Sequence, residues 1–94
     1  ACLSYVYNHH QRELARRLLQ TQHAHHDLTL STLHVHLDHE NCLEVVVLQG
    51  NTSDVRHIAE ATIADTGVRH GNLHLVPVEK VRNHQGHEHI HPKT

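Results

Sequence analysis

Apolar residues recur along this chain with two periods, and the two periods alternate in a regular order. A period of two, typical of β-strands, occurs in four segments, and a period of three to four, typical of amphipathic helices, occurs in two. The strands are expected at about residues 2–7, 28–37, 42–48 and 71–78, and the helices at about 9–23 and from about 52 to Gly67. The order β-α-β-β-α-β predicts an α+β, ferredoxin-like fold: a four-stranded antiparallel sheet with both helices on one face.

The ends of the predicted helices carry recognisable signals. Asn8 is a candidate N-cap for the first helix, whose apolar stripe is formed by Leu14, Ala15, Leu18 and Leu19. Asn51 or Thr52 is a candidate cap for the second helix, and Gly67 is expected as the residue that ends it. In the second predicted strand, we expect Leu33, Val35 and Leu37 to face the helices, which places His34 and His36 on the open face of the sheet.

Length and composition restrict the classes of function. Ninety-four residues make one small domain, and a core without Phe or Trp must be built from Leu, Val, Ile and Ala. The formal charge of −2 argues against a polyanion-binding surface in this chain. No apolar run approaches the ~20 residues that cross a bilayer. Cys2 and Cys42 could form a disulfide, but the absence of a secretory signal favours reduced thiols in the cytoplasm.

A candidate metal site follows from the spacing of His34, His36 and Cys42. If residues 37–41 form a hairpin loop, His36 lies opposite Cys42 and His34 opposite Glu44, all on one face. Two imidazoles and a thiolate suit Zn(II), Ni(II) or Cu(II). Each residue also has a plain structural interpretation: surface histidines, a small buried thiol and an exposed glutamate. Glu44 is otherwise a candidate to orient a ligand. The missing fourth ligand is one of His23, His25 and His26, or a water molecule.

Several separate motifs together resemble the C-terminal domain of the nickel-responsive regulator family NikR. They are Ser-Tyr-Val-Tyr at 4–7, Thr-Gln-His-Ala-His-His-Asp-Leu at 21–28, Thr-Leu-His-Val-His at 32–36, Cys-Leu-Glu at 42–44 and Gly-Val-Arg-His-Gly at 67–71. The resemblance covers about residues 2–78. It implies an ACT-like fold, a homotetramer and one square-planar Ni(II) per subunit. It also implies that His34, His36 and Cys42 of one subunit bind the ion together with His23 of a neighbour, supported by Glu44.

The same resemblance implies a cytoplasmic transcriptional repressor. Its operator DNA would be bound by an N-terminal ribbon-helix-helix domain that is absent from this sequence, and no membrane partner or catalytic activity is expected. The main alternative is a cytosolic metal storage or delivery protein. An amino-acid-binding ACT module and a Cys/His or metal-dependent enzyme are further alternatives, although the sequence contains no HExxH motif or nucleophile elbow.

The two parts of the chain differ in composition. Residues 1–78 are expected to form the metal-binding and oligomerisation domain. Residues 79–94 lack periodicity and form a His-rich tail, which we expect to be flexible, with extra weak metal binding as the alternative. Its histidines are His84, His87, His89 and His91. His57 and His70 are further candidates for binding metal at high loading, whereas His9, His10, His39 and His74 are expected to be surface or structural histidines.

Overall fold

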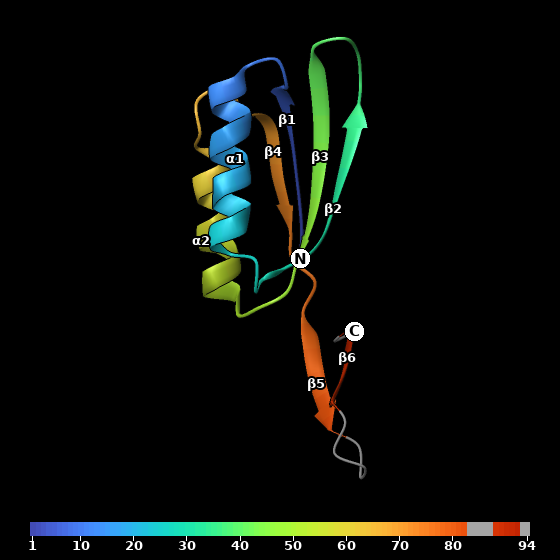
Figure 1. Ribbon diagram of the computed structural model, residues 1–94. Coiled ribbons are helices and arrows are strands. Elements are labelled where there is room, and N and C mark those ends of the chain that lie inside the picture. The colour runs from blue at the N-terminus through green and yellow to red at the C-terminus, as the bar shows by residue number, and fades with distance from the viewer. Residues whose placement is uncertain (83–87, 93–94) are drawn as a thin grey trace.

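The computed structural model describes the backbone of residues 1–82 and 88–92 and the side chains of residues 1–78. Its elements are β1 (Cys2–Asn8), α1 (Arg12–Ala24), β2 (Thr29–His36), β3 (Asn41–Leu48), α2 (Thr52–Ile63), β4 (Arg69–His74), β5 (Val78–Arg82) and β6 (Glu88–Pro92). The first four strands form an antiparallel sheet in the order β2-β3-β1-β4, and both helices lie on one side of it (Figure 1). The predicted ferredoxin-like fold is confirmed.

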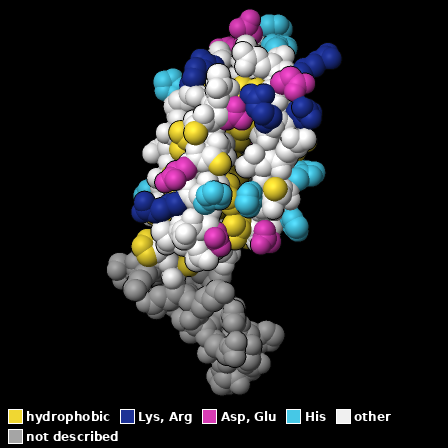
Figure 2. Space-filling model, turned by 90° about the vertical axis from the view of Figure 1, so that its left-hand side faces the viewer, with side chains coloured by type: hydrophobic (Ala, Val, Ile, Leu, Met, Phe, Trp, Pro, Cys, Tyr) yellow, Lys and Arg dark blue, Asp and Glu magenta, His cyan; other side chains and the backbone are white. Residues whose placement is uncertain are grey.

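The core lies between the helices and the face of the sheet formed by β1 and β3. Alternate residues of these two strands are buried, because alternate side chains of a strand point to one face. The buried apolar residues are Leu3, Tyr5, Tyr7, Leu14, Leu18, Cys42, Val46, Leu48, Val55, Ile58 and Ala59. Figure 2 shows the helix side, where charged and histidine side chains cover the surface and hydrophobic ones appear between them.

The orientation predicted for β2 is wrong. Because His34 pairs with Glu44, a buried residue of β3, it lies on the helix-facing side of the sheet, and Leu33 and Val35 lie on the open face. The physical reason is the position of the strand. β2 is the edge strand next to β3, and it lies at the side of the sheet farther from the helices (Figure 1). Its helix-facing positions therefore stay accessible and suit histidines.

The helix ends differ in part from the predicted signals. Asn8 belongs to β1, and its side chain accepts a hydrogen bond from the backbone of His10, so α1 begins only at Arg12, after Gln11. Asn51 caps α2 as expected. Gly67 does not end α2, which stops at Ile63; it lies in the following turn with a φ of 94°. No helix in the described part of the chain is long and apolar enough to cross a membrane.

The C-terminal segment contains a β-hairpin where the sequence showed no periodicity. β5 and β6 pair antiparallel and form a separate two-stranded sheet, which extends away from the larger sheet (Figure 1). His89 and His91 belong to β6, whereas His84 and His87 lie outside the described residues. The flexibility expected for residues 79–94 stays a prediction.

Candidate metal centre

The β2–β3 loop sets the register on which the metal site was predicted. Leu37 donates its backbone N–H to the carbonyl of Asn41, and Asp38 accepts hydrogen bonds from the backbone N–H groups of Glu40 (2.9 Å) and Asn41 (2.8 Å). The hydrogen bonds from the side chain and then the backbone of Asn41 lower the pKa of Asp38 to about 2. The closed loop places His34 opposite Glu44 and His36 opposite Cys42, as the spacing predicted.

Two of the predicted ligands, His34 and Cys42, lie close to each other, with Glu44 beside His34. The Nδ1 atom of His34 lies 3.9 Å from the sulfur of Cys42 and 3.4 Å from a carboxylate oxygen of Glu44. The His34 side chain is 55 % exposed, whereas that of Glu44 is only 2 % exposed. Cys42 is also buried and counts among the core residues, and its sulfur lies near the ring of His34. The site therefore joins a buried acid and thiol to an accessible imidazole.

Glu44 is held by residues of three other elements. Gln22, near the end of α1, donates a side-chain hydrogen bond to its carboxylate and a second one to the hydroxyl of Tyr5 (3.4 Å). Tyr5 lies directly opposite Glu44 on β1. Burial, followed by the charge of Glu44, raises the pKa of Tyr5 and of Tyr7 well above the ordinary value of 10.0. Because an unpaired buried carboxylate is costly, these partners and His34 stabilise its charge.

His36 takes a different neighbour from His34. Although it pairs with Cys42 across the strands, its ring packs edge-on against that of His9, with ring centroids 4.9 Å apart. The ring of His9 also lies near that of His10, and its Nδ1 atom is buried with no hydrogen-bond partner among the described residues. Burial and then the neighbouring imidazoles lower the pKa of His9, which favours its neutral form.

Within one chain the structure brings only His34 and Cys42 of the four predicted ligands together: the ring of His36 packs against His9, and no contact joins His23 to the other three in the described residues. His23 lies exposed in the last turn of α1, one residue after Gln22, and His25 and His26 follow it. Among the side chains that the structure describes, no three or more His, Cys, Asp or Glu residues are grouped so as to hold a metal ion. The role of His23 as a ligand therefore stays a prediction.

The donor atoms that do converge fit a borderline divalent ion. Such an ion binds imidazole nitrogen at about 2.0–2.1 Å and thiolate sulfur at about 2.3 Å, so the two donors can lie up to ~4.4 Å apart. The 3.9 Å between His34 Nδ1 and Cys42 Sγ falls within that limit. The adjacent carboxylate of Glu44 supplies negative charge beside the same nitrogen. Nitrogen and sulfur donors together favour Ni, Cu or Zn over Mg or Ca.

Comparison with known protein families identifies the domain. The model of the NikR C-terminal nickel-binding domain matches residues 1–76. The chain belongs to this family. As a NikR C-terminal domain, it is a nickel-binding regulatory domain, and its family is not a catalytic one. The match ends at residue 76, before β5 and β6 begin.

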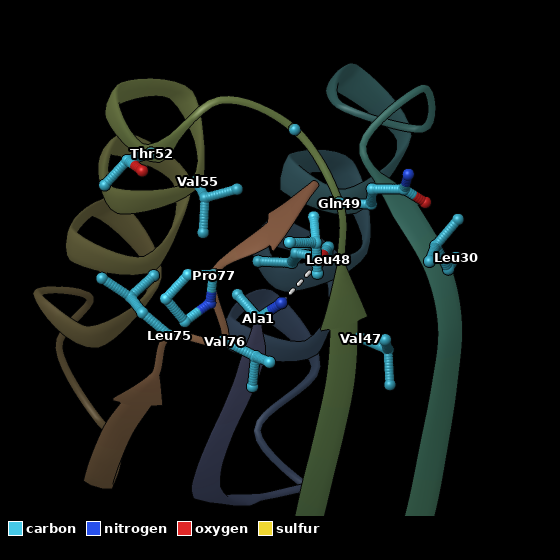
Figure 3. A pocket seen from close by; sticks show the side chains of 12 residues that line it. Ala1, Leu30, Val47, Leu48, Gln49, Thr52, Val55, Leu75, Val76 and Pro77 are labelled. Carbon is cyan, nitrogen blue, oxygen red and sulfur yellow. Dashed lines mark hydrogen bonds between the residues drawn. The ribbon is translucent and has the colours of Figure 1, made fainter. Parts of the chain in front are cut away.

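An apolar pocket of about 290 Å³ in this NikR domain lies at the end of β3 away from Cys42. Figure 3 shows its side chains, which come from the start of β2 and the end of β3 (Leu30 and Val47), from the first turn of α2, and from the loops after β3 and β4, which include Pro77. The amino group of Ala1 donates a hydrogen bond to the carbonyl of Leu48 (2.8 Å) at its edge. Among the residues with described side chains, no Lys or Arg lines the pocket.

Sequence reasoning missed the residues that support Glu44 and His36. Gln22, Tyr5 and Tyr7 were assigned no role at the site, and His9 was expected to be a surface or structural histidine. The sequence did contain a signal for the tyrosines, because the predicted strand at residues 2–7 places Tyr5 and Tyr7 on one face. In the structure, this is the face that also carries Cys42 and Glu44. No pattern in the sequence indicates that Gln22 reaches from α1 to β3, because that contact depends on how the helix packs.

Proposed function

We propose that this domain is the nickel sensor of a transcriptional repressor. His34, His36 and Cys42 of one subunit and His23 of a neighbour would hold one Ni(II) per subunit in a homotetramer. Nickel binding would favour the arrangement in which an N-terminal ribbon-helix-helix domain binds operator DNA. The observation that carries the proposal is the convergence of His34, Cys42 and Glu44 in a domain of the nickel-binding family.

The residues of this chain can contribute to sensing in a defined way. In the structure, the carboxylate of Glu44 lies 3.4 Å from His34 Nδ1, so it would place negative charge beside a divalent cation bound to that imidazole. Because the ligands must be a neutral imidazole and a thiolate, nickel occupancy should decrease at acid pH.

A physical connection exists between the site and the segment that contains His23. Gln22 bonds to Glu44, and the hydroxyl of Thr32 on β2 lies 3.4 Å from the side-chain oxygen of Gln22. The end of α1 is thus hydrogen-bonded to β2 and to β3, the two strands that carry His34, His36 and Cys42. A metal shared with a neighbouring subunit would stabilise this segment in one position, and the shift in population would be passed to the attached DNA-binding domains.

The first test is a titration of Ni(II) into the protein, monitored by the thiolate-to-nickel charge-transfer absorption. Cys42→Ala should abolish the band and weaken nickel binding by more than about 100-fold, the upper end for losing a residue that merely supports a ligand. Cys2→Ala is the matched control, because Cys2 is the other thiol of the chain and should leave both unchanged. An unaltered band in Cys42→Ala would show that the assignment of the sulfur ligand is wrong.

The contribution of His23 from a second subunit needs a separate experiment. His23→Ala and Cys42→Ala should each lack the band when expressed alone. When the two variants are co-expressed, some sites combine an intact His34, His36 and Cys42 set with an intact His23 from the other variant. The band should then reappear. Its continued absence in mixed oligomers of confirmed composition would contradict a ligand set shared between subunits.

The stoichiometry of binding separates a sensor from a storage or delivery protein. A sensor binds one ion tightly per subunit and keeps this site when residues 79–94 are removed. A storage protein binds several ions of similar weak affinity, and removal of the His-rich segment lowers the total. Location in the cytoplasm belongs to the same proposal, since a reduced Cys42 is required for metal binding.

A further inference from the structure

The hairpin of β5 and β6 lies beyond the residues that match the nickel-binding family. It forms a sheet of its own and contains two histidines in one short strand. A single two-stranded hairpin is only marginally stable in water. An interaction that joins its two strands would therefore have a large effect on whether the hairpin forms.

The register of the hairpin places metal-binding residue types at neighbouring positions. Glu79 pairs with His91, and Val81 pairs with His89. Directly opposed positions of an antiparallel pair share a face, with Cβ atoms about 4.5–5.5 Å apart, and positions two apart on one strand share it too. Glu79, His89 and His91 thus occupy adjoining positions on one face of the hairpin.

The positively charged residues of the hairpin fall on its other face. Lys80 and Arg82 alternate with Glu79 and Val81 along β5, and Lys80 pairs with Ile90. The face with the positions of Glu79, His89 and His91 therefore has two histidines and one glutamate, and neither Lys80 nor Arg82 belongs to it. Two histidines and one carboxylate on one side of a metal are a recurrent ligand set for divalent first-row ions. Water molecules can occupy the remaining coordination positions.

We propose that Glu79, His89 and His91 form a second metal site, for a divalent first-row transition ion, on one face of the C-terminal hairpin. The site joins β5 to β6, so binding stabilises the paired strands. It differs from the proposed site in the core in having no sulfur ligand and in needing residues of one chain only. It does not depend on the nickel-sensing function being correct.

The experiment titrates Ni(II) into the full chain and records bound metal by equilibrium dialysis together with the charge-transfer band. We expect a first equivalent that produces the band and a weaker second equivalent that does not, because its donors are nitrogen and oxygen only. His89→Ala/His91→Ala should remove the second equivalent and leave the first unchanged. Glu79→Gln, which keeps the shape of the side chain, should weaken the second equivalent by at least about tenfold.

The matched control is His84→Ala/His87→Ala, which also removes two histidines from the same segment. It should leave the second equivalent in place. Equal losses in both double variants would overturn the proposal, since binding would then follow histidine content and not the hairpin register. A second equivalent unaffected by His89→Ala/His91→Ala, or the absence of any second equivalent, would overturn it too. Cys42→Ala should remove the band and the tight first equivalent and leave the second equivalent in place, so the two proposed sites can fail independently.

Discussion

At the scale of single residues, the carboxylate of Glu44 determines the chemistry of the candidate site. It is almost completely buried, yet it contacts the partly exposed imidazole of His34 and a helix side chain, Gln22. A charge in such a place is stable only while its partners remain, because loss of one partner leaves it unpaired in a poorly solvating environment. Substitutions around Glu44 should therefore affect stability as well as metal binding.

The buried environment of Tyr5 should make the stability of the protein depend on pH in the alkaline range. Its pKa is raised by burial and then by Glu44, whereas in the unfolded chain it titrates near 10.0. Above that pH the unfolded state loses the proton and the folded state keeps it, so the free energy of unfolding should decrease as pH rises, by at most ~1.4 kcal/mol per pH unit for each such tyrosine. Tyr5→Phe should reduce this slope in denaturant titrations between about pH 9 and pH 11. Absorbance of the native protein showing both tyrosines ionising near their ordinary pKa would contradict the prediction.

The sequence predicted the pairing of the site residues better than their surroundings. A loop length of a few residues determines the register, so His34 with Glu44 and His36 with Cys42 followed from counting. The contact of His36 with His9 could not be predicted in this way. His9 lies after β1, and only the three-dimensional position of the β2–β3 hairpin brings it to that ring.

At the scale of elements, the two helices begin in different ways. α2 has a reciprocal cap, in which Asn51 accepts a hydrogen bond from the backbone of Asp54 (2.8 Å) and donates one to its carboxylate (2.9 Å). α1 has no side-chain cap at Gln11. Its start is fixed instead by the turn that follows β1, where the backbone of Gln11 bonds to the carbonyl of Asn8 (3.1 Å).

Removal of the cap of α2 gives a prediction at this scale. Asn51→Ala should lower the free energy of unfolding by about 1 kcal/mol, because it leaves one of the first backbone N–H groups of the helix without its acceptor. Thr52→Ala is the control, since Thr52 is the exposed first residue of the helix and does not serve as the cap. Urea denaturation of the two variants measures the difference, and equal stabilities would show that the cap contributes nothing.

The positions of the elements from β1 to β4 followed from the sequence, whereas the face that the edge strand β2 turns toward the helices did not. β2 alternates His34 and His36 with Leu33 and Val35, and helix packing was expected to select the apolar set. That expectation holds for a strand covered by helices, such as β3 with its buried Val46 and Leu48. It fails for β2, because the position of a strand within the sheet is a property of the topology and not of its own residues.

At the scale of the whole molecule, the orientation of β2 produces an apolar surface on the open face of the sheet. Leu33 is 57 % exposed, Val35 is 36 % exposed, and Val47 of the neighbouring strand is 39 % exposed. Leu33 lies opposite Val45, and Val35 lies opposite Leu43, so the apolar positions continue from β2 onto β3. A contiguous apolar surface of this kind typically marks a site of protein association, which supports the proposal that the domain forms a homotetramer.

A charge placed in this surface tests that proposal directly. Leu33→Asp should shift the protein from tetramer to smaller species in sedimentation equilibrium, because assembly would bury an unpaired carboxylate against apolar side chains. Leu33→Met is the matched control, since it keeps an apolar side chain of similar volume and should keep the tetramer. If His23 is donated across subunits, Leu33→Asp should also weaken nickel binding although Leu33 is not a ligand, and the loss should be smaller at higher protein concentration, because mass action restores the assembly. A Leu33→Asp protein that remains tetrameric would place the interface elsewhere on the domain.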